Sequence, residues 1–265
     1  MDSNKIQPDS QLPKLWVLHN MPRSGGTLVS KCFGSMESVV LLSEIHPDAQ
    51  HAVSFNALNQ AQKWYALLPD LDWQKTEFVD AIIQIQDVVK KDNKQLILRD
   101  WSHVDYLGPP VTNKPKGKPA LIDVLSPYFD IRSIQLVRHP LDTWLSLRRL
   151  NLIKKNGIDF EQFLKACRCY LESTGSEHRL VYEEFLKSSS EQLEIACRQV
   201  GLVYDEEYQD RWFEFDKITG DTSNSGSLRE KPVIAFRARR KCEDIDLEWL
   251  NKQEDYKYLI GEVYE

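Results

Sequence analysis

The chain has 265 residues, of which 42% are hydrophobic and 28% are charged, a composition typical of a globular protein with a sizeable core. Its formal net charge of −6 argues against a nucleic-acid-binding surface, because such surfaces are basic. A polar N-terminus, and no apolar run near the roughly 20 residues of a membrane span, predict a cytoplasmic protein without a membrane partner. The five scattered cysteines are interpreted as reduced packing residues, so we expect no metal site.

Five short apolar runs predict strands, and helical patterns separate them. The strands are expected at residues 15–19, 39–42, 95–99, 131–138 and 179–182. Most of these runs are continuously apolar rather than alternating, which favours parallel strands buried on both faces. Strands that alternate with helices predict an α/β fold, with a parallel β-sheet flanked by helices. We expect a single domain over residues 1–265.

The most informative segment is residues 15–36, where an apolar run precedes a tight polar loop and then apolar residues at helical spacing. A strand, a loop and a helix start in this order form an anion cradle, because backbone N–H groups converge there. Gly25 and Gly26 let the main chain approach a phosphate closely, while Arg23 and Thr27 add side-chain donors. Gly26 stands where a nucleoside-triphosphatase loop needs lysine, and an ordinary strand-to-helix turn is the alternative interpretation.

A helical insertion is expected at about residues 47–93. Phe78, Ile82, Ile85 and Val89 keep the spacing of one helix face, and several aromatic residues precede them. Two interpretations are equally open: a pair of packing helices, or a lid whose aromatic residues shape a substrate pocket.

Two later segments have distinct compositions. Residues 108–119 hold four prolines, two glycines and three lysines, which predicts an irregular connection near the mouth of a pocket. The segment after Lys241 is acidic and is expected to be helical, with Leu247, Leu250 and Leu259 as its apolar contacts.

The second informative segment is residues 131–150, where a predicted strand leads through Arg138 into a helix that begins near Pro140. Ser146 lies eight positions after Arg138, two turns into that helix. An arginine leaving a strand and a serine on the next helix can meet at a second phosphate. One loop for a phosphate and one Arg–Ser pair for another indicate a doubly phosphorylated nucleotide.

Together these segments resemble the sulfotransferase family, which uses 3′-phosphoadenosine 5′-phosphosulfate (PAPS). The first is similar to the family's 5′-phosphosulfate loop, and the second to its 3′-phosphate motif, Arg–x7–Ser. Residues 178–186 resemble a third motif, whose tyrosine, here Tyr182, lies near the adenosine. Residues 222–229 resemble the late loop that closes over the nucleotide.

The resemblance covers about residues 15–229 and implies a P-loop-like nucleotide-binding fold with PAPS as co-substrate and adenosine 3′,5′-bisphosphate (PAP) as product. It implies a small molecule with a hydroxyl group as the acceptor. The residues that it assigns to the nucleotide are Arg23, Ser24, Gly25, Gly26, Thr27, Leu28, Arg138, Ser146, Tyr182, Ser227 and Arg229.

Sulfuryl transfer to a hydroxyl needs a base for the acceptor proton and a cation for the charge that grows on the leaving phosphate. Arg23 is expected to supply the cation. The resemblance implies Glu or His as the base, according to the branch of the family. Glu44 is the first candidate and His103 the second, with Asp100 and His46 next, because all four follow predicted strands.

Two other functions stay open on the sequence. A small-molecule kinase would use a similar scaffold, and Asp100 could then serve as a Mg²⁺ ligand, although the P-loop lysine is missing. A non-catalytic nucleotide-binding module would keep the anion cradle and lack the base.

Overall fold

The computed structural model describes residues 12–149, 151–174, 178–220, 232–236 and 245–264. Its sheet consists of β1 (Lys14–Asn20), β2 (Val39–Ile45), β3 (Gln95–Asp100), β4 (Asp130–Val137) and β5 (His178–Val181). The strand order is β2-β3-β1-β4-β5, and every neighbouring pair is parallel. The predicted α/β class and the five predicted strands are therefore confirmed, with ends that differ by at most three residues.

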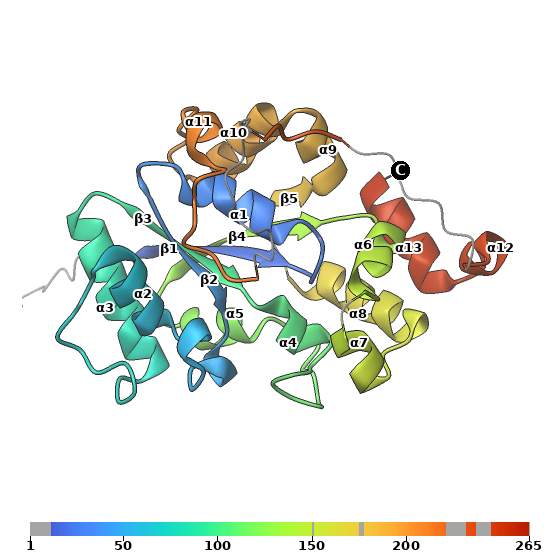
Figure 1. Ribbon diagram of the computed structural model, residues 1–265, viewed down its shortest axis with the longest axis horizontal. Coiled ribbons are helices and arrows are strands. Elements are labelled where there is room, and N and C mark those ends of the chain that lie inside the picture. Colours follow the sequence, from blue (N-terminus) through green and yellow to red (C-terminus); the bar gives the residue numbers. More distant parts are fainter. Residues whose placement is uncertain (1–11, 150, 175–177, 221–231, 237–244, 265) are drawn as a thin grey trace, which may run out of the picture.

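Helices cover both faces of the sheet and one of its ends (Figure 1). On one face lie α1 (Gly26–Gly34), α9 (Tyr182–Lys187), α10 (Ser189–Val200) and α11 (Tyr208–Arg211). On the other lie α2 (Ala57–Tyr65), α3 (Phe78–Lys91) and α5 (Ala120–Leu125), with the short 3₁₀ turns η1 (Pro47–Ala49) and η2 (Val53–Phe55) nearby. Toward the β4 and β5 side lie α6 (Pro140–Leu147), α7 (Asn151–Asn156), α8 (Phe160–Ser173), α12 (Leu247–Leu250) and α13 (Glu254–Tyr264), and the short α4 (Ser102–Tyr106) follows β3 and contacts β1 and α8.

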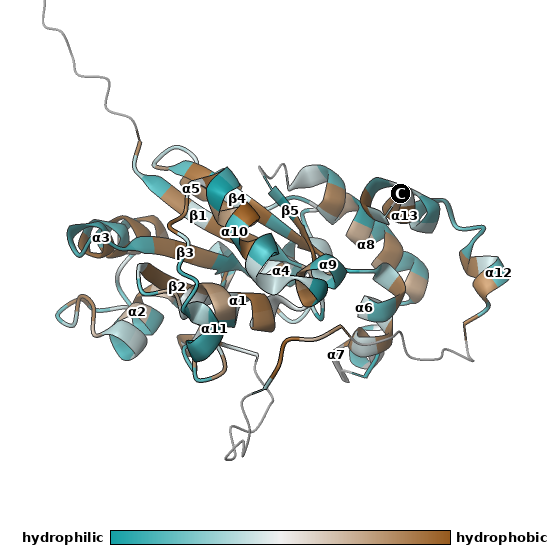
Figure 2. Ribbon diagram, turned by 90° about the horizontal axis from the view of Figure 1, so that it is seen from above, coloured by the Kyte–Doolittle hydropathy of each residue, from teal (hydrophilic) through white to brown (hydrophobic). Residues whose placement is uncertain are grey.

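Alternate residues of the strands face two separate cores. Trp16 and Leu18 of β1 pack with α1 and α10, whereas Leu15 and Val17 of the same strand pack with α2, α3 and α5. Both sets are buried, which explains why β1 is continuously apolar. Figure 2 shows the same feature as a hydrophobic band along β3, whereas helices such as α3 and α8 carry both colours.

The insertion at residues 47–93 is mainly a packing layer. Ile82, Ile85 and Val89 of α3 are buried in the second core, and Trp73 packs against it. No described residue of the insertion lines either of the two large cavities described below. Its link to the site is indirect: the ring of Phe55 stacks on Trp101, with centroids 4.2 Å apart.

The C-terminal helices confirm two of three expected apolar contacts. Leu250 and Leu259 are buried in a third core with α6 and α8, but Leu247 is 56% exposed, so its predicted contact is wrong. Leu247 is the first residue of the short helix α12, and its side chain lies outside that core. Among the described residues, no helix is both long enough and apolar enough to cross a bilayer.

The strand order divides the carboxyl edge of the sheet into two halves around β1. Chain connections turn in one direction from β1 to β2, and in the other from β3 to β4, so the order reverses beside β1. A parallel α/β sheet binds ligands at such a point, because the loops on either side diverge and leave a crevice. Loops after β1, β4 and β5 meet in one half, and residues after β2 and β3 meet in the other.

Candidate active site

The loop between β1 and α1 turns sharply around residues 22–25. Arg23 and Gly25 both have positive φ angles, 67° and 98°, and α1 begins at Gly26. The hydroxyl and the N–H of Ser24 both donate to the carbonyl of Met21, at 2.7 and 3.2 Å. Ser24 thus holds the turn, and it does not line the large cavity. The first N–H groups of α1 have no partner within the helix and point to its N-terminal side, where an anion is favoured.

Two glycines of this loop are in close contact with neighbouring side chains. A Cβ atom on Gly25 would come within 2.1 Å of the Tyr182 ring, and one on Gly26 within 2.4 Å of the Asn20 amide. Asn20 is fixed in turn, because Arg99 donates from Nε to its Oδ1 at 3.1 Å. Side chains from β1 and from the start of α9 therefore pack against the loop and leave no room for a larger residue.

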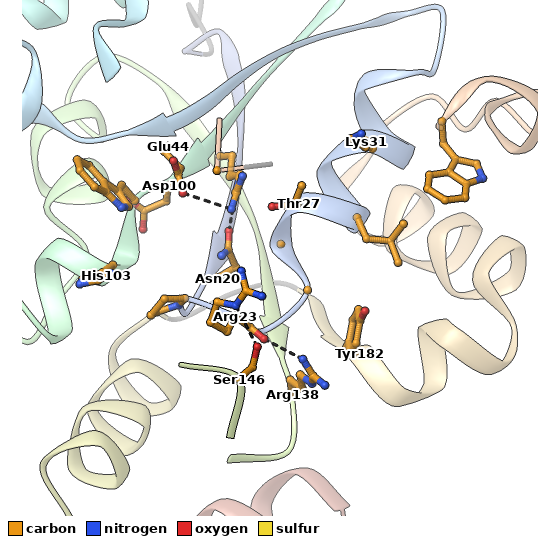
Figure 3. A pocket seen from close by; sticks show the side chains of 18 of the residues that line it. Asn20, Arg23, Thr27, Lys31, Glu44, Asp100, His103, Arg138, Ser146 and Tyr182 are labelled. Atoms are coloured by element: carbon orange, nitrogen blue, oxygen red, sulfur yellow. Dashed lines mark hydrogen bonds and ion pairs between the residues drawn. The ribbon is translucent and has the colours of Figure 1, made fainter. Parts of the chain in front are cut away.

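Arg138 and Ser146 meet the same loop from the other side. Arg138 donates from Nη1 to the carbonyl of Arg23 at 2.9 Å, and its guanidinium lies 5.0 Å from the centre of the Tyr182 ring. The side chain of Arg23 donates from Nε to the hydroxyl of Ser146 at 3.0 Å. The two motifs that the sequence predicts to bind separate phosphates are thus in direct contact (Figure 3).

These residues line a cavity of about 630 Å³, which joins the two halves of the carboxyl edge. Figure 3 shows Arg138, Ser146 and Tyr182 at one side of this cavity and Glu44, Asp100 and His103 at the other. The lining residues are Asn20, Pro22, Arg23, Gly25, Gly26, Thr27, Leu28, Lys31, Glu44, Arg99, Asp100, Trp101, His103, Pro110, Arg138, Ser146, Tyr182, Trp212 and Gly220. A second cavity of about 540 Å³ shares Arg23, Leu28, Arg138, Ser146, Tyr182 and Trp212 with the first.

Glu44 reaches the cavity because β2 is irregular where it stands. The register of β2 against β3 shifts between Leu42 and Ile45, and Glu44 has a φ of 55°, unusual for a residue other than glycine. Its carboxylate lies 3.6 Å from Nη2 of the buried Arg99. The guanidinium of Arg99 also donates to Asn20 and Ser43, so it orients Glu44 from a fixed position.

His103 presents an imidazole nitrogen without a protein partner. The residue is buried on α4, and its Nε2 has no hydrogen bond among the described residues. Burial lowers the pKa of His103 below its usual value, and a hydrogen bond to the Pro109 backbone and the nearby Glu44 carboxylate oppose this shift. Because proline offers only its carbonyl, the ring must donate from Nδ1, which leaves a lone pair on Nε2 of the neutral ring.

Asp100 and His46 are held in other interactions. Asp100 Oδ2 accepts from the Ser102 hydroxyl at 2.7 Å and lies 2.7 Å from Nδ1 of His19, whereas its Oδ1 is buried without a partner in the described structure. His46 accepts the N–H of Asp48 on Nδ1, its Nε2 lies 3.2 Å from Asp105, and it does not line either large cavity. Of the four candidate bases, three line the cavity and His46 does not.

Several lining residues were not assigned to the site from the sequence. Asn20 is the last residue of β1 and Arg99 the second-last of β3, and only the pairing of these strands shows that the two residues meet. Lys31 lies one turn after Thr27, a spacing that could have indicated a shared helix face. Trp212 follows α11 and has no such signal. The assigned Ser227 and Arg229, with the loop at 222–229, lie outside the described residues.

The fold of this chain is similar to that of the sulfotransferase domain from the olefin synthase of Synechococcus PCC 7002. The TM-score is 0.65, and the identity is 18% over 96% of each chain. The TM-score to sulfotransferase STF9 from Mycobacterium avium is 0.44, with 12% identity over 78% of this chain and 68% of that one. The TM-score to mouse sulfotransferase SULT7A1 complexed with PAP is 0.40, with 14% identity over 94% of this chain and 82% of that one. No protein-family model and no curated protein sequence matches the chain. The chain therefore has the sulfotransferase fold that its motifs predicted.

Gly25→Ala tests whether the tight loop binds an anion. The new Cβ would collide with Tyr182 and strain a backbone at φ 98°, so we expect nucleotide binding to be lost. Gly201→Ala is a matched control, since it puts the same strain at φ 71° with no atom nearer than 3.7 Å. The backbone strain should cost both variants about 1–2 kcal/mol in the free energy of unfolding, and Gly25→Ala should lose more because the Tyr182 ring must move. Calorimetric titration with PAP should then separate them, and normal binding by Gly25→Ala would show that the loop is only a turn.

Proposed function

We propose that the protein transfers a sulfuryl group from PAPS to a hydroxyl group of a small-molecule acceptor. The observation that carries this proposal is the contact between the two phosphate motifs. Arg138 donates to the carbonyl of Arg23, and Arg23 donates to Ser146, so donors for two separated phosphates line one cavity. A nucleotide with a 5′-phosphosulfate and a 3′-phosphate fits this pattern of donors. The similarity in fold to a sulfotransferase domain supports the same proposal.

The half of the site after β1, β4 and β5 would hold the nucleotide. Backbone N–H groups of Gly25, Gly26, Thr27 and Leu28 would bind the 5′-phosphate, because they open α1 on its electropositive side. Arg138 and Ser146 would bind the 3′-phosphate. The ring of Tyr182, which already lies beneath the guanidinium of Arg138, would border the adenosine.

The half after β2 and β3 would bind the acceptor. Trp101 supplies an apolar wall, and its stacking on Phe55 fixes the orientation of the indole. Glu44 and His103 supply polar atoms on the same side of the cavity. A hydroxyl bound here would face the phosphates across β1, and an in-line transfer needs the acceptor and the leaving group on opposite sides of the sulfur.

His103 is the base that this geometry supports best. Its neutral ring would accept the hydroxyl proton at Nε2, since Nδ1 already donates to Pro109. Glu44 would stabilise the imidazolium that forms, because its carboxylate interacts favourably with a charged His103. Arg99 keeps Glu44 in place through a contact of 3.6 Å. Arg23 would leave Ser146 and neutralise the charge that grows on the bridging oxygen of the departing PAP.

A thermal-shift titration distinguishes this function from the two alternatives. We expect PAP to stabilise the protein, by roughly 2.7 kcal/mol at 100 times its Kd, and ATP–Mg²⁺ to have little effect. A kinase would give the reverse order, although Oδ2 of Asp100 is already engaged by Ser102 and His19. If PAP stabilises the protein but labelled sulfate does not move from PAPS to any of a panel of hydroxylated metabolites, a non-catalytic module is the better description.

Arg138→Ala should weaken PAP binding about ten- to hundredfold, because a charge-assisted hydrogen bond contributes roughly 1.5–3 kcal/mol. Affinity for adenosine 5′-phosphate should barely change. Arg132→Ala is the matched control, since Arg132 lies on β4, the strand that leads to Arg138, and pairs with Asp130 outside the cavity. Calorimetry with both nucleotides gives the result, and equal losses for the two would refute the assignment of Arg138 to the 3′-phosphate.

His103→Asn and Glu44→Gln together identify the base. The variant that lacks the base should lose roughly 10²–10⁴ in kcat while its Kd for PAP stays normal. We expect this from His103→Asn, with a smaller loss from Glu44→Gln. Since the pKa of His103 is lowered, the wild-type kcat should be level near pH 7 and fall only as the pH drops through a value below 6.5.

The reverse order of the two losses would make Glu44 the base. Near wild-type activity in both variants would contradict the catalytic assignment without affecting the nucleotide site, and Asp100 would be tested next.

A further inference from the structure

The short connection between β4 and α6 is anchored by Glu183, a residue that does not line the 630 Å³ cavity. Only Arg138 and His139 separate the end of β4 from the first residue of α6. The backbone N–H of His139 donates to Oε1 of Glu183 at 3.0 Å. The conformation of Arg138 is thus fixed on one side by the pairing of Val137 with Val181, and on the other by Glu183.

The second oxygen of Glu183 is held by the C-terminal helix α13. The hydroxyl of Tyr264 donates to Oε2 at 2.9 Å, and its ring lies 5.4 Å from the ring of His139. Burial and then the Glu183 carboxylate raise the pKa of Tyr264, so the phenol stays protonated and keeps donating. The ring of Tyr256, which is also on α13, lies 6.0 Å from the ring of His139.

The two hydrogen bonds of Glu183 keep its carboxylate away from the place where a phosphate is expected. Glu183 lines the 540 Å³ cavity beside Arg138 and Ser146, where a phosphate is expected. A carboxylate that turned into this cavity would repel a phosphate and compete for Arg138. With each oxygen accepting a hydrogen bond, the carboxylate is instead directed at the His139 peptide and at α13.

We infer that Glu183 and Tyr264 are positioning residues, through which α13 sets the orientation of Arg138 and hence the selectivity for a 3′-phosphate. This inference rests on the proposed function, because it requires Arg138 to bind that group. The effect should be confined to ligands that carry the 3′-phosphate, since neither residue contacts the loop between β1 and α1 through any bond described here.

Tyr264→Phe is the direct test, because it removes the hydroxyl and keeps the ring against His139. We expect the affinity for PAP to fall roughly three- to tenfold, less than the full value of a hydrogen bond to a charged group because Tyr264 acts on Arg138 only through Glu183, with the affinity for adenosine 5′-phosphate unchanged. Tyr258→Phe is the matched control on the same helix, since Tyr258 faces Arg168. Calorimetry gives the Kd of each nucleotide. The ratio of the Kd for adenosine 5′-phosphate to the Kd for PAP measures the selectivity, and we expect it to fall in Tyr264→Phe and not in Tyr258→Phe.

Glu183→Gln provides a second, independent variant. An amide keeps one acceptor oxygen for the His139 N–H, and its NH₂ group can only donate to the Tyr264 hydroxyl, so two charge-assisted bonds become weaker neutral ones and the same ratio should fall. Glu184→Gln is its control, because Glu184 pairs with Lys187 at the surface. Thermal unfolding of all four variants separates misfolding from an altered site.

The outcomes separate the inference from the proposed function. A wild-type protein that binds both nucleotides equally would overturn the proposed function, and the inference with it. A selective wild type together with unchanged ratios in Tyr264→Phe and Glu183→Gln would overturn the inference alone. Equal weakening of both nucleotides would also overturn it, since that result indicates a purely structural role.

Discussion

The hydrogen bond from Arg138 to the carbonyl of Arg23 is the contact on which the rest of the site depends. It joins the loop after β1 to the loop after β4, and it is possible because the two strands are paired neighbours. The Tyr182 ring, from the start of α9 directly after β5, supports the guanidinium and fills the space beside Gly25. Three neighbouring strands of the sheet thereby bring the donors that we propose for two phosphates into one cavity. The donors lie in the loops and helices that follow these strands, so the order of the strands fixes which of them can meet.

A buried arginine has a comparable role in the other half of the site. Arg99 is desolvated, which lowers its pKa, and the Glu44 carboxylate opposes that shift. A buried guanidinium is costly unless its donors are satisfied, and here they reach Asn20, Ser43 and Glu44. Removing one partner would leave a buried charge unpaired, so these groups are expected to act as a unit. By contrast, Nε2 of His103 and Oδ1 of Asp100 are buried without partners in the described structure. Unsatisfied polar atoms are uncommon in protein interiors, and their presence in the walls of one cavity is consistent with a site for a polar ligand.

Local pattern predicted the strands and both phosphate motifs, because each depends on residues that are close in sequence. Continuous burial of β1 on both faces made its apolar run easy to recognise. Partners distant in sequence could not be predicted in this way. Arg99 belongs to the site because β3 lies beside β1, and Glu44 faces the cavity because of an irregularity in β2. The sequence could not show that both ring nitrogens of His46 interact with Asp48 and Asp105. The aromatic residues of the insertion were ambiguous, since a lid and a packed layer need the same residue types.

A crystal structure of the protein with PAP would test the central claim most directly. We expect the 3′-phosphate within hydrogen-bonding distance of Arg138 and Ser146, and the 5′-phosphate on the backbone N–H groups at the start of α1. The adenosine should border Tyr182, and the half of the cavity beside His103 should stay accessible to an acceptor. A nucleotide bound in the reverse orientation, or away from both motifs, would contradict the proposal that the meeting of β1 and β4 forms a site for two phosphates.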